Sequence, residues 1–81
     1  MAYFARIQDG IVTDVIEVND AEVPDEAAGQ AFIASVGLEG EWVQTSIDGG
    51  PIDGQDRGPY AGIGYTWDGT VFAAPIIEGT A

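Results

Sequence analysis

Two strand-forming runs joined by Asp-Gly constrain the fold of this chain more than any other sequence feature. Ala2 to Gln8 (AYFARIQ) and Ile11 to Val18 (IVTDVIEV) are rich in aromatic and β-branched residues. Asp9-Gly10 between them is typical of a two-residue type I′ turn, in which both central residues need positive φ. The sequence therefore predicts an antiparallel hairpin over residues 1–18 in which Gln8 faces Ile11 and the pairing continues without interruption.

Both faces of this predicted hairpin carry apolar side chains. In an uninterrupted register, one face holds Tyr3, Ile7, Val12, Ile16 and Val18, and the other holds Phe4, Ile11 and Val15. A sheet that only covers its own core shows one apolar and one polar face. The second face is therefore expected to pack on a helix, on a terminal segment or on another subunit.

Residues 25–36 (DEAAGQAFIASV) have the pattern of a helix of about three turns. Acidic residues gather at its start, where the helix dipole favours them, and Gly37 stands where a left-handed residue ends many helices. The apolar stripe of this helix consists of Ala28, Phe32 and Val36, with Ile33 beside it. Gly29 inside the helix costs about 1 kcal/mol relative to alanine. We expect a helix this weak to depend on packing against the sheet.

The second half of the chain contains a strand, a loop and another Asp-Gly signal. Residues 41–47 (EWVQTSI) alternate as a strand does, and residues 48–59 form a Gly/Asp-rich loop. Residues 60–73 flank Asp68-Gly69, which predicts a second two-residue hairpin, and residues 74–81 form a tail that we expect to be held by a contact. We thus expect one α+β domain over residues 1–81, with an antiparallel sheet of about five strands and one short helix on a face.

Charge and residue types narrow the classes of function. The 81 residues include 14 acidic ones and two arginines but no lysine, histidine or cysteine, so the net charge is −12. Nucleic acids and anionic membranes are bound through basic side chains, so neither is expected as a partner. The hydrophobic content of 46% argues against intrinsic disorder. No signal peptide and no membrane-spanning run is visible.

Residue types suited to catalysis or metal binding are sparse. Without histidine or lysine, Ser35 and Ser46 have no ordinary activating base, so we expect neither an enzyme nor a cofactor. Asp48, Asp53 and Asp56 are candidate Ca²⁺ ligands, although their spacing differs from that of an EF-hand. The alternative, which we favour, is that they are turn aspartates that accept hydrogen bonds from the local backbone.

The stretch between the two tryptophans holds the most distinctive residues. Arg57 is expected to form a bidentate carboxylate pair or to stack on an aromatic ring, within the chain or across subunits. The alternative is a local salt bridge to Asp53 or Asp56. The aromatic residues of this stretch fit a core, a binding interface or a carbohydrate platform. The residues that we select as interface candidates are Phe4, Trp42, Arg57, Tyr60, Tyr65 and Trp67.

Four motifs of this chain resemble motifs of the small virion-associated proteins of marine tailed bacteriophages, including cyanophages. They are MAYFARI at the start of the chain, FIASVG at residues 32–37, WVQTS at residues 42–46 and RGPYAGIGYTWD at residues 57–68. The last two are the most specific. The chain departs from this pattern in its Gly/Asp-rich insert at residues 48–56 and in Trp67, where tyrosine is expected.

The resemblance implies a structural part of a virion. It suggests a capsid decoration or cement protein that sits on the capsid exterior, binds the major capsid protein and forms a homo-oligomer, with a trimer favoured. An alternative is a tail or tail-fibre attachment module that binds a receptor or glycan through Trp42, Tyr65 and Trp67. A third is a phage-encoded protein that acts inside the host cell and is absent from particles.

Overall fold

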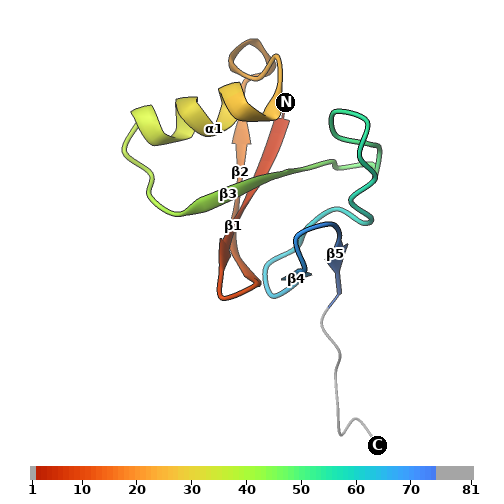
Figure 1. Ribbon diagram of the computed structural model, residues 1–81. Helices are drawn as coiled ribbons and strands as arrows, with labels where there is room; N and C mark the ends of the chain where they lie inside the picture. Colours follow the sequence, from red (N-terminus) through yellow and green to blue (C-terminus); the bar gives the residue numbers. More distant parts are fainter. Residues whose placement is uncertain (1, 75–81) are drawn as a thin grey trace, which may run out of the picture.

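The computed structural model describes residues 2–74, which form a mixed α+β domain (Figure 1). One antiparallel five-stranded sheet has the order β3-β1-β2-β4-β5, and one α-helix lies between β2 and β3 in the chain. This agrees with the expected fold class. The elements are β1 (Ala2–Gln8), β2 (Ile11–Val18), the 3-10 helix η1 (Asp20–Glu22), α1 (Glu26–Ser35), β3 (Glu41–Thr45), β4 (Thr66–Trp67) and β5 (Phe72–Ala73).

A tight turn at Asp9-Gly10 joins the two longest strands, β1 and β2. Asp9 has φ 54° and Gly10 has φ 76°, the left-handed conformations that a type I′ turn requires. Gln8 pairs with Ile11 across this turn. The short polar side chain of aspartate and the absence of a side chain on glycine allow both conformations at low cost.

The register of this hairpin changes beyond its second pair. Ile7 still faces Val12, but Arg6 faces Asp14, so Thr13 is an extra residue on β2. Its hydroxyl accepts a hydrogen bond from Arg6 Nε at 3.1 Å and donates one to the Arg6 carbonyl oxygen at 3.4 Å. The two bonds hold a β-bulge at this position.

The bulge corrects the predicted faces of the hairpin. Because one extra residue moves every later side chain to the opposite face, Val15 joins the face of Ile7, whereas Ile16 and Val18 join the face of Phe4. Our sequence prediction was wrong for these three residues of β2. It assumed an uninterrupted register, and the bulge at Thr13 breaks that register.

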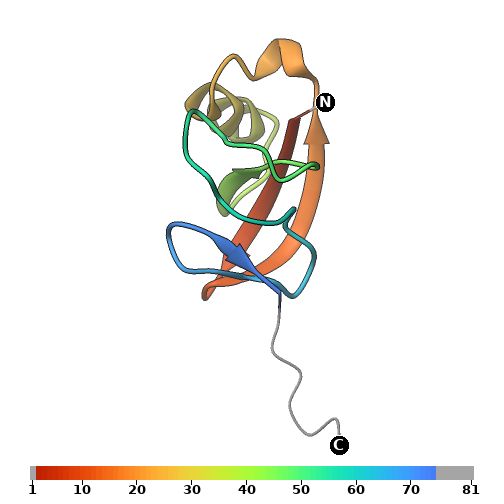
Figure 2. The same cartoon turned by 90° about the vertical axis from the view of Figure 1, so that its right-hand side faces the viewer.

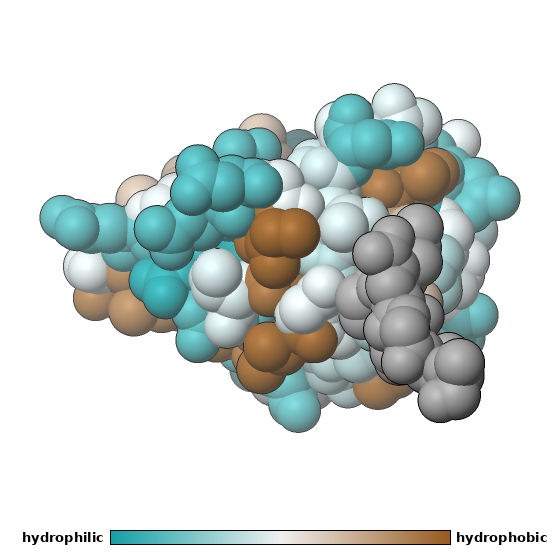
Figure 3. All heavy atoms as spheres, turned by 90° about the horizontal axis from the view of Figure 1, so that it is seen from below, coloured by the Kyte–Doolittle hydropathy of each residue, from teal (hydrophilic) through white to brown (hydrophobic). Residues whose placement is uncertain are grey.

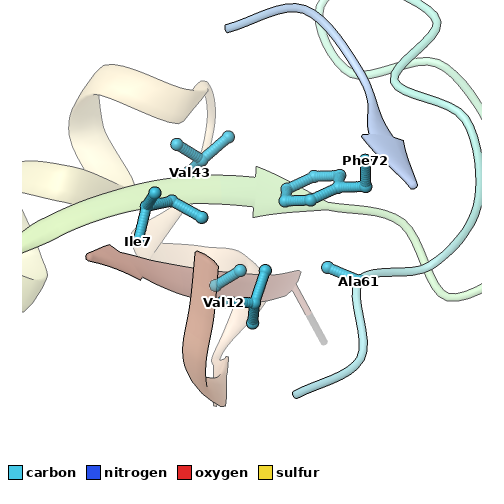
Figure 4. Close-up of a cluster of buried hydrophobic side chains, with 6 residues drawn as sticks. Ile7, Val12, Val43, Ala61 and Phe72 are labelled. Carbon is cyan, nitrogen blue, oxygen red and sulfur yellow. The ribbon is translucent and has the colours of Figure 1, made fainter. Parts of the chain in front are cut away.

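Both faces of the sheet are covered by segments of this same chain. One buried cluster, the helix-side core, contains Ala2, Phe4, Val18, Ile33 and Trp42. The other, the loop-side core, contains Ala5, Ile7, Val12, Val43, Ala61 and Phe72, drawn from four strands and the loop before β4 (Figure 4). The helix packs near the open end of the β1–β2 hairpin, while β4 and β5 lie near its turn (Figure 2). The second apolar face thus packs within the chain.

Helix α1 begins and ends within one residue of the predicted bounds, and it buries only part of the predicted stripe. Asp25 caps it by accepting a hydrogen bond from the Ala28 amide at 2.8 Å, and Gly37 follows it with φ 91°. Its buried residues are Gly29 and Ile33, whereas Val36 is 57% exposed. Phe32 of the predicted stripe packs against the helix-side core together with Ile33, so the prediction was wrong at Val36.

Gly29 allows the helix to approach the sheet closely. A Cβ atom at this position would lie 2.3 Å from Phe4 Cζ, which is far inside van der Waals contact. The ring of Phe4 is fully buried against the helix backbone. The glycine therefore lowers intrinsic helix stability but makes room for Phe4, the largest fully buried side chain among the described residues.

The segments after β3 differ most from expectation. Strand β3 ends at Thr45, before the predicted end at Ile47, and the predicted strand over residues 60–67 is reduced to Thr66–Trp67. Residues 62–65 instead form a turn in which the Tyr65 amide donates to the Gly62 carbonyl oxygen at 3.0 Å, with Gly64 at φ 91°. The glycines that suggested a bare strand face belong to this turn.

The second hairpin has a longer connection than predicted. Trp67 faces Phe72, so residues 68–71 connect β4 to β5, not Asp68-Gly69 alone. Asp68 Oδ1 accepts hydrogen bonds from the amides of Thr70 at 2.8 Å and Val71 at 2.9 Å, and these bonds stabilise the wider turn. The predicted tail contact at residues 75–81 lies outside the described residues.

Candidate functional site

Arg57 stands at the centre of the most connected polar cluster among the described residues. Its guanidinium forms a two-point ion pair with Glu26, in which NH2 donates to Oε1 at 2.7 Å and NH1 donates to Oε2. NH1 also donates to the Gln44 carbonyl oxygen at 2.8 Å, and Nε donates to Gln55 Oε1 at 3.1 Å. One side chain therefore links the loop after β3 to helix α1 and to β3 itself.

The Arg57 cluster is largely shielded from water. The Arg57 side chain is 11% exposed and that of Glu26 is 18% exposed. Burial would raise the pKa of Glu26, but hydrogen bonds from Arg57 and from the Gln44 amide, together with the Arg57 charge, hold the pKa below its usual value. Glu26 is therefore ionised at neutral pH, and both of its carboxylate oxygens accept hydrogen bonds within the chain.

An aromatic ring completes this cluster. The Arg57 guanidinium carbon lies 5.5 Å from the centre of the Trp67 ring, within the range of a cation–π contact. Trp67 also contacts Phe72, with ring centres 4.5 Å apart. The Phe72 amide donates to the Arg57 carbonyl oxygen at 2.9 Å, so backbone and side chain of Arg57 hold the same hairpin.

Arg6 forms a smaller and more open version of this arrangement. Its guanidinium carbon lies 5.9 Å from the centre of the Trp42 ring, and NH2 pairs with Asp14 Oδ2 at 2.5 Å. The side chains of Arg6 and Asp14 are 40% and 45% exposed. Both arginines, the only basic side chains of the sequence, are thus engaged within the chain.

A pair of tyrosines lies on the loop-side face, near the start of β1. Tyr3 and Tyr60 meet edge to face, with ring centres 5.6 Å apart. Burial, the Tyr3 hydroxyl and the charge of Glu17 raise the pKa of Tyr60, so this phenol stays protonated at neutral pH. The neighbouring Thr45 hydroxyl is buried and accepts from the Ala61 amide at 3.0 Å. This packing fixes the start of the loop before β4.

The structure separates the six interface candidates into two groups. Phe4 is 0% exposed and Trp42 is 6% exposed, so both belong to the helix-side core. Selecting these two as contact residues was wrong, because α1 covers them. Arg57 pairs with Glu26 and not with Asp53 or Asp56. The remaining candidates, which are partly exposed, are Tyr60, Tyr65 and Trp67.

The three loop aspartates lie apart from one another, and only Asp48 and Asp56 accept hydrogen bonds from the local backbone, as the turn interpretation predicts. Asp48 Oδ1 accepts from the Ser46 hydroxyl and from the Gly50 amide, Asp56 Oδ1 accepts from the Gly58 amide, and Asp53 Oδ2 accepts from the Glu26 amide at 3.3 Å. Within residues 2–74, no three acidic side chains gather as a metal site would need.

Sequence reasoning did not find Glu26 as the partner of Arg57. The two residues are 31 positions apart, and neither spacing nor composition distinguishes Glu26 from the other acidic residues at the helix start. The Asp9-Gly10 turn, the α1 crossover and the loop after β3 must all be in place before the two side chains meet. A weak sequence signal existed only for Arg57, because a lone arginine in an acidic loop needs a carboxylate.

Comparison with known proteins gives no relative. No family model, no curated protein and no solved structure matches this chain. Among the described residues, no helix is long and apolar enough to cross a membrane.

Proposed function

We propose that this protein is a structural virion component of a tailed phage, which decorates the capsid exterior and stabilises the shell by binding the major capsid protein. The sequence motifs at residues 42–46 and 57–68 support this proposal through their resemblance to virion-associated proteins. The observation that carries it physically is the distribution of charge. In this role the protein stabilises the capsid lattice and catalyses no reaction.

The surface of this protein offers carboxylates with almost no competing positive charge. Both arginine side chains are occupied by intramolecular partners, so they do not neutralise distant acidic groups. The acidic residues that lie exposed on the described surface are Asp9, Glu17, Asp20, Glu22, Asp25, Glu39, Glu41, Asp48, Asp53, Asp56 and Asp68. Such a surface is repelled by packaged DNA and attracted to a basic rim on a partner protein.

Exposed apolar side chains are spread over this acidic surface. The large ones are Ile11, Val36, Leu38, Ile47 and Ile63. On the face seen in Figure 3, hydrophilic side chains separate the apolar ones into small groups. A mosaic of this kind fits a contact that combines charge steering with a few apolar anchors, as protein interfaces generally do.

A ligand that binds only the assembled lattice stabilises that lattice by mass action. The test is therefore to strip the protein from purified particles and to add it back at low and at high salt. We expect restored particles to release DNA at a higher temperature than stripped ones, with reattachment weakened at high salt. Equal release temperatures with and without bound protein would contradict the proposal.

The alternative, a tail or tail-fibre module that binds a receptor or glycan, has less support. Of its three proposed contact residues, Trp42 is buried, and the Trp67 ring is already in contact with Arg57 and Phe72. Immunogold labelling of intact particles separates the two functions. Label over the head supports decoration, label confined to the tail supports attachment, and a protein absent from particles contradicts both.

A further inference from the structure

Strand β2 is paired on its far side along only part of its length. β4 pairs with it at Ile11. The Val12 amide then donates to the Tyr65 carbonyl oxygen at 2.8 Å, and the Val12 carbonyl oxygen accepts from the Gly64 amide at 2.9 Å. Beyond Val12, no residue within the described range 2–74 pairs with this side of β2. Figure 2 shows the second half of β2 along the right-hand margin of the domain.

The backbone groups that point outward from this half-strand belong to Val15 and Glu17. Antiparallel strands exchange hydrogen bonds at every second residue pair. Phe4 faces Gln44 on β3 and Ile16 on β2, and the Gln44 amide and carbonyl bond instead to side chains of other elements. Phe4 therefore bonds to Ile16. The backbone groups of Val15 and Glu17, on either side of Ile16, point away from β1.

The outer edge of β3 is closed in a way that this part of β2 is not. Gln30 Nε2 donates to the Trp42 carbonyl oxygen at 2.7 Å, and Glu26 Oε2 accepts from the Gln44 amide at 2.8 Å. Helix α1 thus supplies side chains that occupy the backbone groups of β3. An edge without such partners can accept an extended segment, which adds a strand to the sheet.

The side chains along the second half of β2 favour a basic strand as the occupant. Glu17 is exposed and faces Tyr3 on the loop-side face, and Ile16 is partly exposed at the helix-side core. A second copy of the chain would bring an identical glutamate and another net charge of −12, so two copies repel each other. The same charge attracts an extended segment that carries lysine or arginine.

We propose that the backbone of Val15 and Glu17 forms a docking edge for an extended basic segment of the partner protein, added antiparallel to β2. Residues of that segment opposite Val15 and Glu17 would exchange backbone hydrogen bonds with them and place a lysine or arginine beside Glu17. The residue between them would lay an apolar side chain against Ile16. This inference rests on the proposed function, because it names the way in which a basic shell protein is bound.

The test titrates the ¹⁵N-labelled protein with the capped peptide acetyl-KVKVK-amide, using acetyl-EVEVE-amide as the control of opposite charge. We expect amide shifts concentrated at residues 14–18, with a Kd on the order of millimolar for so short a peptide, and no shifts with the acidic control. In the free protein, the amides of Val15 and Glu17 should exchange with solvent faster than that of Ile16.

N-methylated peptides separate strand addition from charge attraction. In the proposed pairing the lysine amides face β2 and the valine amides face away, since residues in a bonded antiparallel pair exchange both hydrogen bonds. Methylation of the lysine amides should therefore abolish binding, whereas methylation of the valine amides should weaken it much less. Both modified peptides keep the charge of the parent peptide.

Variants at Glu17 test the same edge from the side of the protein. Glu17→Gln removes only the charge and should weaken binding about twofold to fivefold. Glu17→Pro also removes the outward amide and should weaken it about tenfold, and proline is tolerated where a strand amide faces solvent. Glu41→Gln, at an exposed residue of β3, is the matched control and should leave binding unchanged.

Equal binding of the two methylated peptides, shifts spread over the whole acidic surface, or slow exchange of Val15 and Glu17 in the free protein would overturn the docking edge. Concentration-dependent shifts at residues 14–18 without peptide would assign the edge to a second copy and also overturn it. None of these results rejects decoration if the protein still stabilises stripped particles. Conversely, specific peptide binding by a protein that does not stabilise particles would support the edge and reject the capsid as its partner.

Discussion

The two arginines of this protein occupy sites made from the same three kinds of group, a guanidinium, an indole ring and a carboxylate, yet the sites differ in burial and in the sequence distance that they bridge. Each arginine lies over a tryptophan and pairs with a carboxylate: Arg6 with Trp42 and Asp14, and Arg57 with Trp67 and Glu26. The pair at Arg6 is 40% and 45% exposed, whereas the pair at Arg57 is 11% and 18% exposed. Because water screens charges, the second pair contributes more to stability.

Sequence separation explains what each site holds together. Arg6 and Asp14 face each other within one hairpin, so their pair supports structure that is already local. Arg57 and Glu26 are 31 positions apart and join the loop to the helix. Arg6 therefore supports a single hairpin, whereas Arg57 holds together segments that are distant in sequence. Four measurements test this difference between the two sites.

The largest effect is expected at the tryptophan rings. Trp42 is 6% exposed in the helix-side core, so Trp42→Ala should lower the free energy of unfolding by about 3–5 kcal/mol. Trp67 is only partly buried, and Trp67→Ala should cost about half as much. Urea denaturation followed by circular dichroism measures both. An unchanged free energy for Trp42→Ala, with defective attachment to particles, would instead assign Trp42 to an interface.

The next effect concerns the arginines themselves. Arg57→Met should destabilise the fold by about 2–4 kcal/mol, because it leaves a shielded Glu26 without its cation. The matched variant Arg6→Met keeps a similar stem and should cost about 0–1 kcal/mol, as exposed pairs do. The same denaturation assay compares them. Equal losses would show that burial does not distinguish the two sites.

The stability that the buried ion pair contributes should depend on pH. Because the folded-state pKa of Glu26 is lowered from 4.5, its ion pair contributes stability that is fully present above that value and is lost as the pH falls through the folded pKa. Glu26→Gln should therefore cost about 1–3 kcal/mol at pH 7 and much less in acid.

Thermal melts of the wild type, Glu26→Gln and Asp14→Asn between pH 7 and pH 3 check this prediction. Asp14→Asn serves as the exposed control, and it should change the melting temperature little across the range. A Glu26→Gln deficit that stays constant down to the lowest pH would mean that the carboxylate charge is not the source of the stability.

Salt should have the smallest effect. At 1 M NaCl the Debye length is about 3 Å, so the cost of Arg6→Met should vanish while most of the cost of Arg57→Met remains. Comparing the two variants in urea at low and high NaCl isolates this difference. If salt removed both costs alike, the Arg57 pair would be as accessible to solvent ions as the Arg6 pair.

Local patterns predicted the elements that depend on local physics. The runs flanking Asp9-Gly10 became β1 and β2, and α1 lies within one residue of the predicted helix and is followed by Gly37, as the sequence indicated. Thr13 gave no such signal, since the bulge depends on hydrogen bonds to the facing strand. Asp68-Gly69 was misread because the hydrogen bonds of Asp68 to Thr70 and Val71 favour a longer turn than the dipeptide alone suggests.

The candidate site, like the fold, could be predicted from the sequence only in part. The sequence predicted that Arg57 pairs with a carboxylate or stacks on an aromatic ring, and its composition showed that the chain is strongly acidic. It did not identify Glu26 as the partner, and it selected Phe4 and Trp42 as contact residues although the helix buries them. Large aromatic residues suit a core and an interface equally well, so only their surroundings decide between the two.

The sequence was enough to predict the α+β class, the first hairpin turn, the approximate ends of the helix and the large negative charge. Each of these follows from residue type or from contacts between near neighbours. The sequence was not enough to predict which side chains of β2 share a face or which carboxylate holds Arg57. These features depend on segments distant in sequence, whose meeting is set by register and packing. No local pattern contains that information.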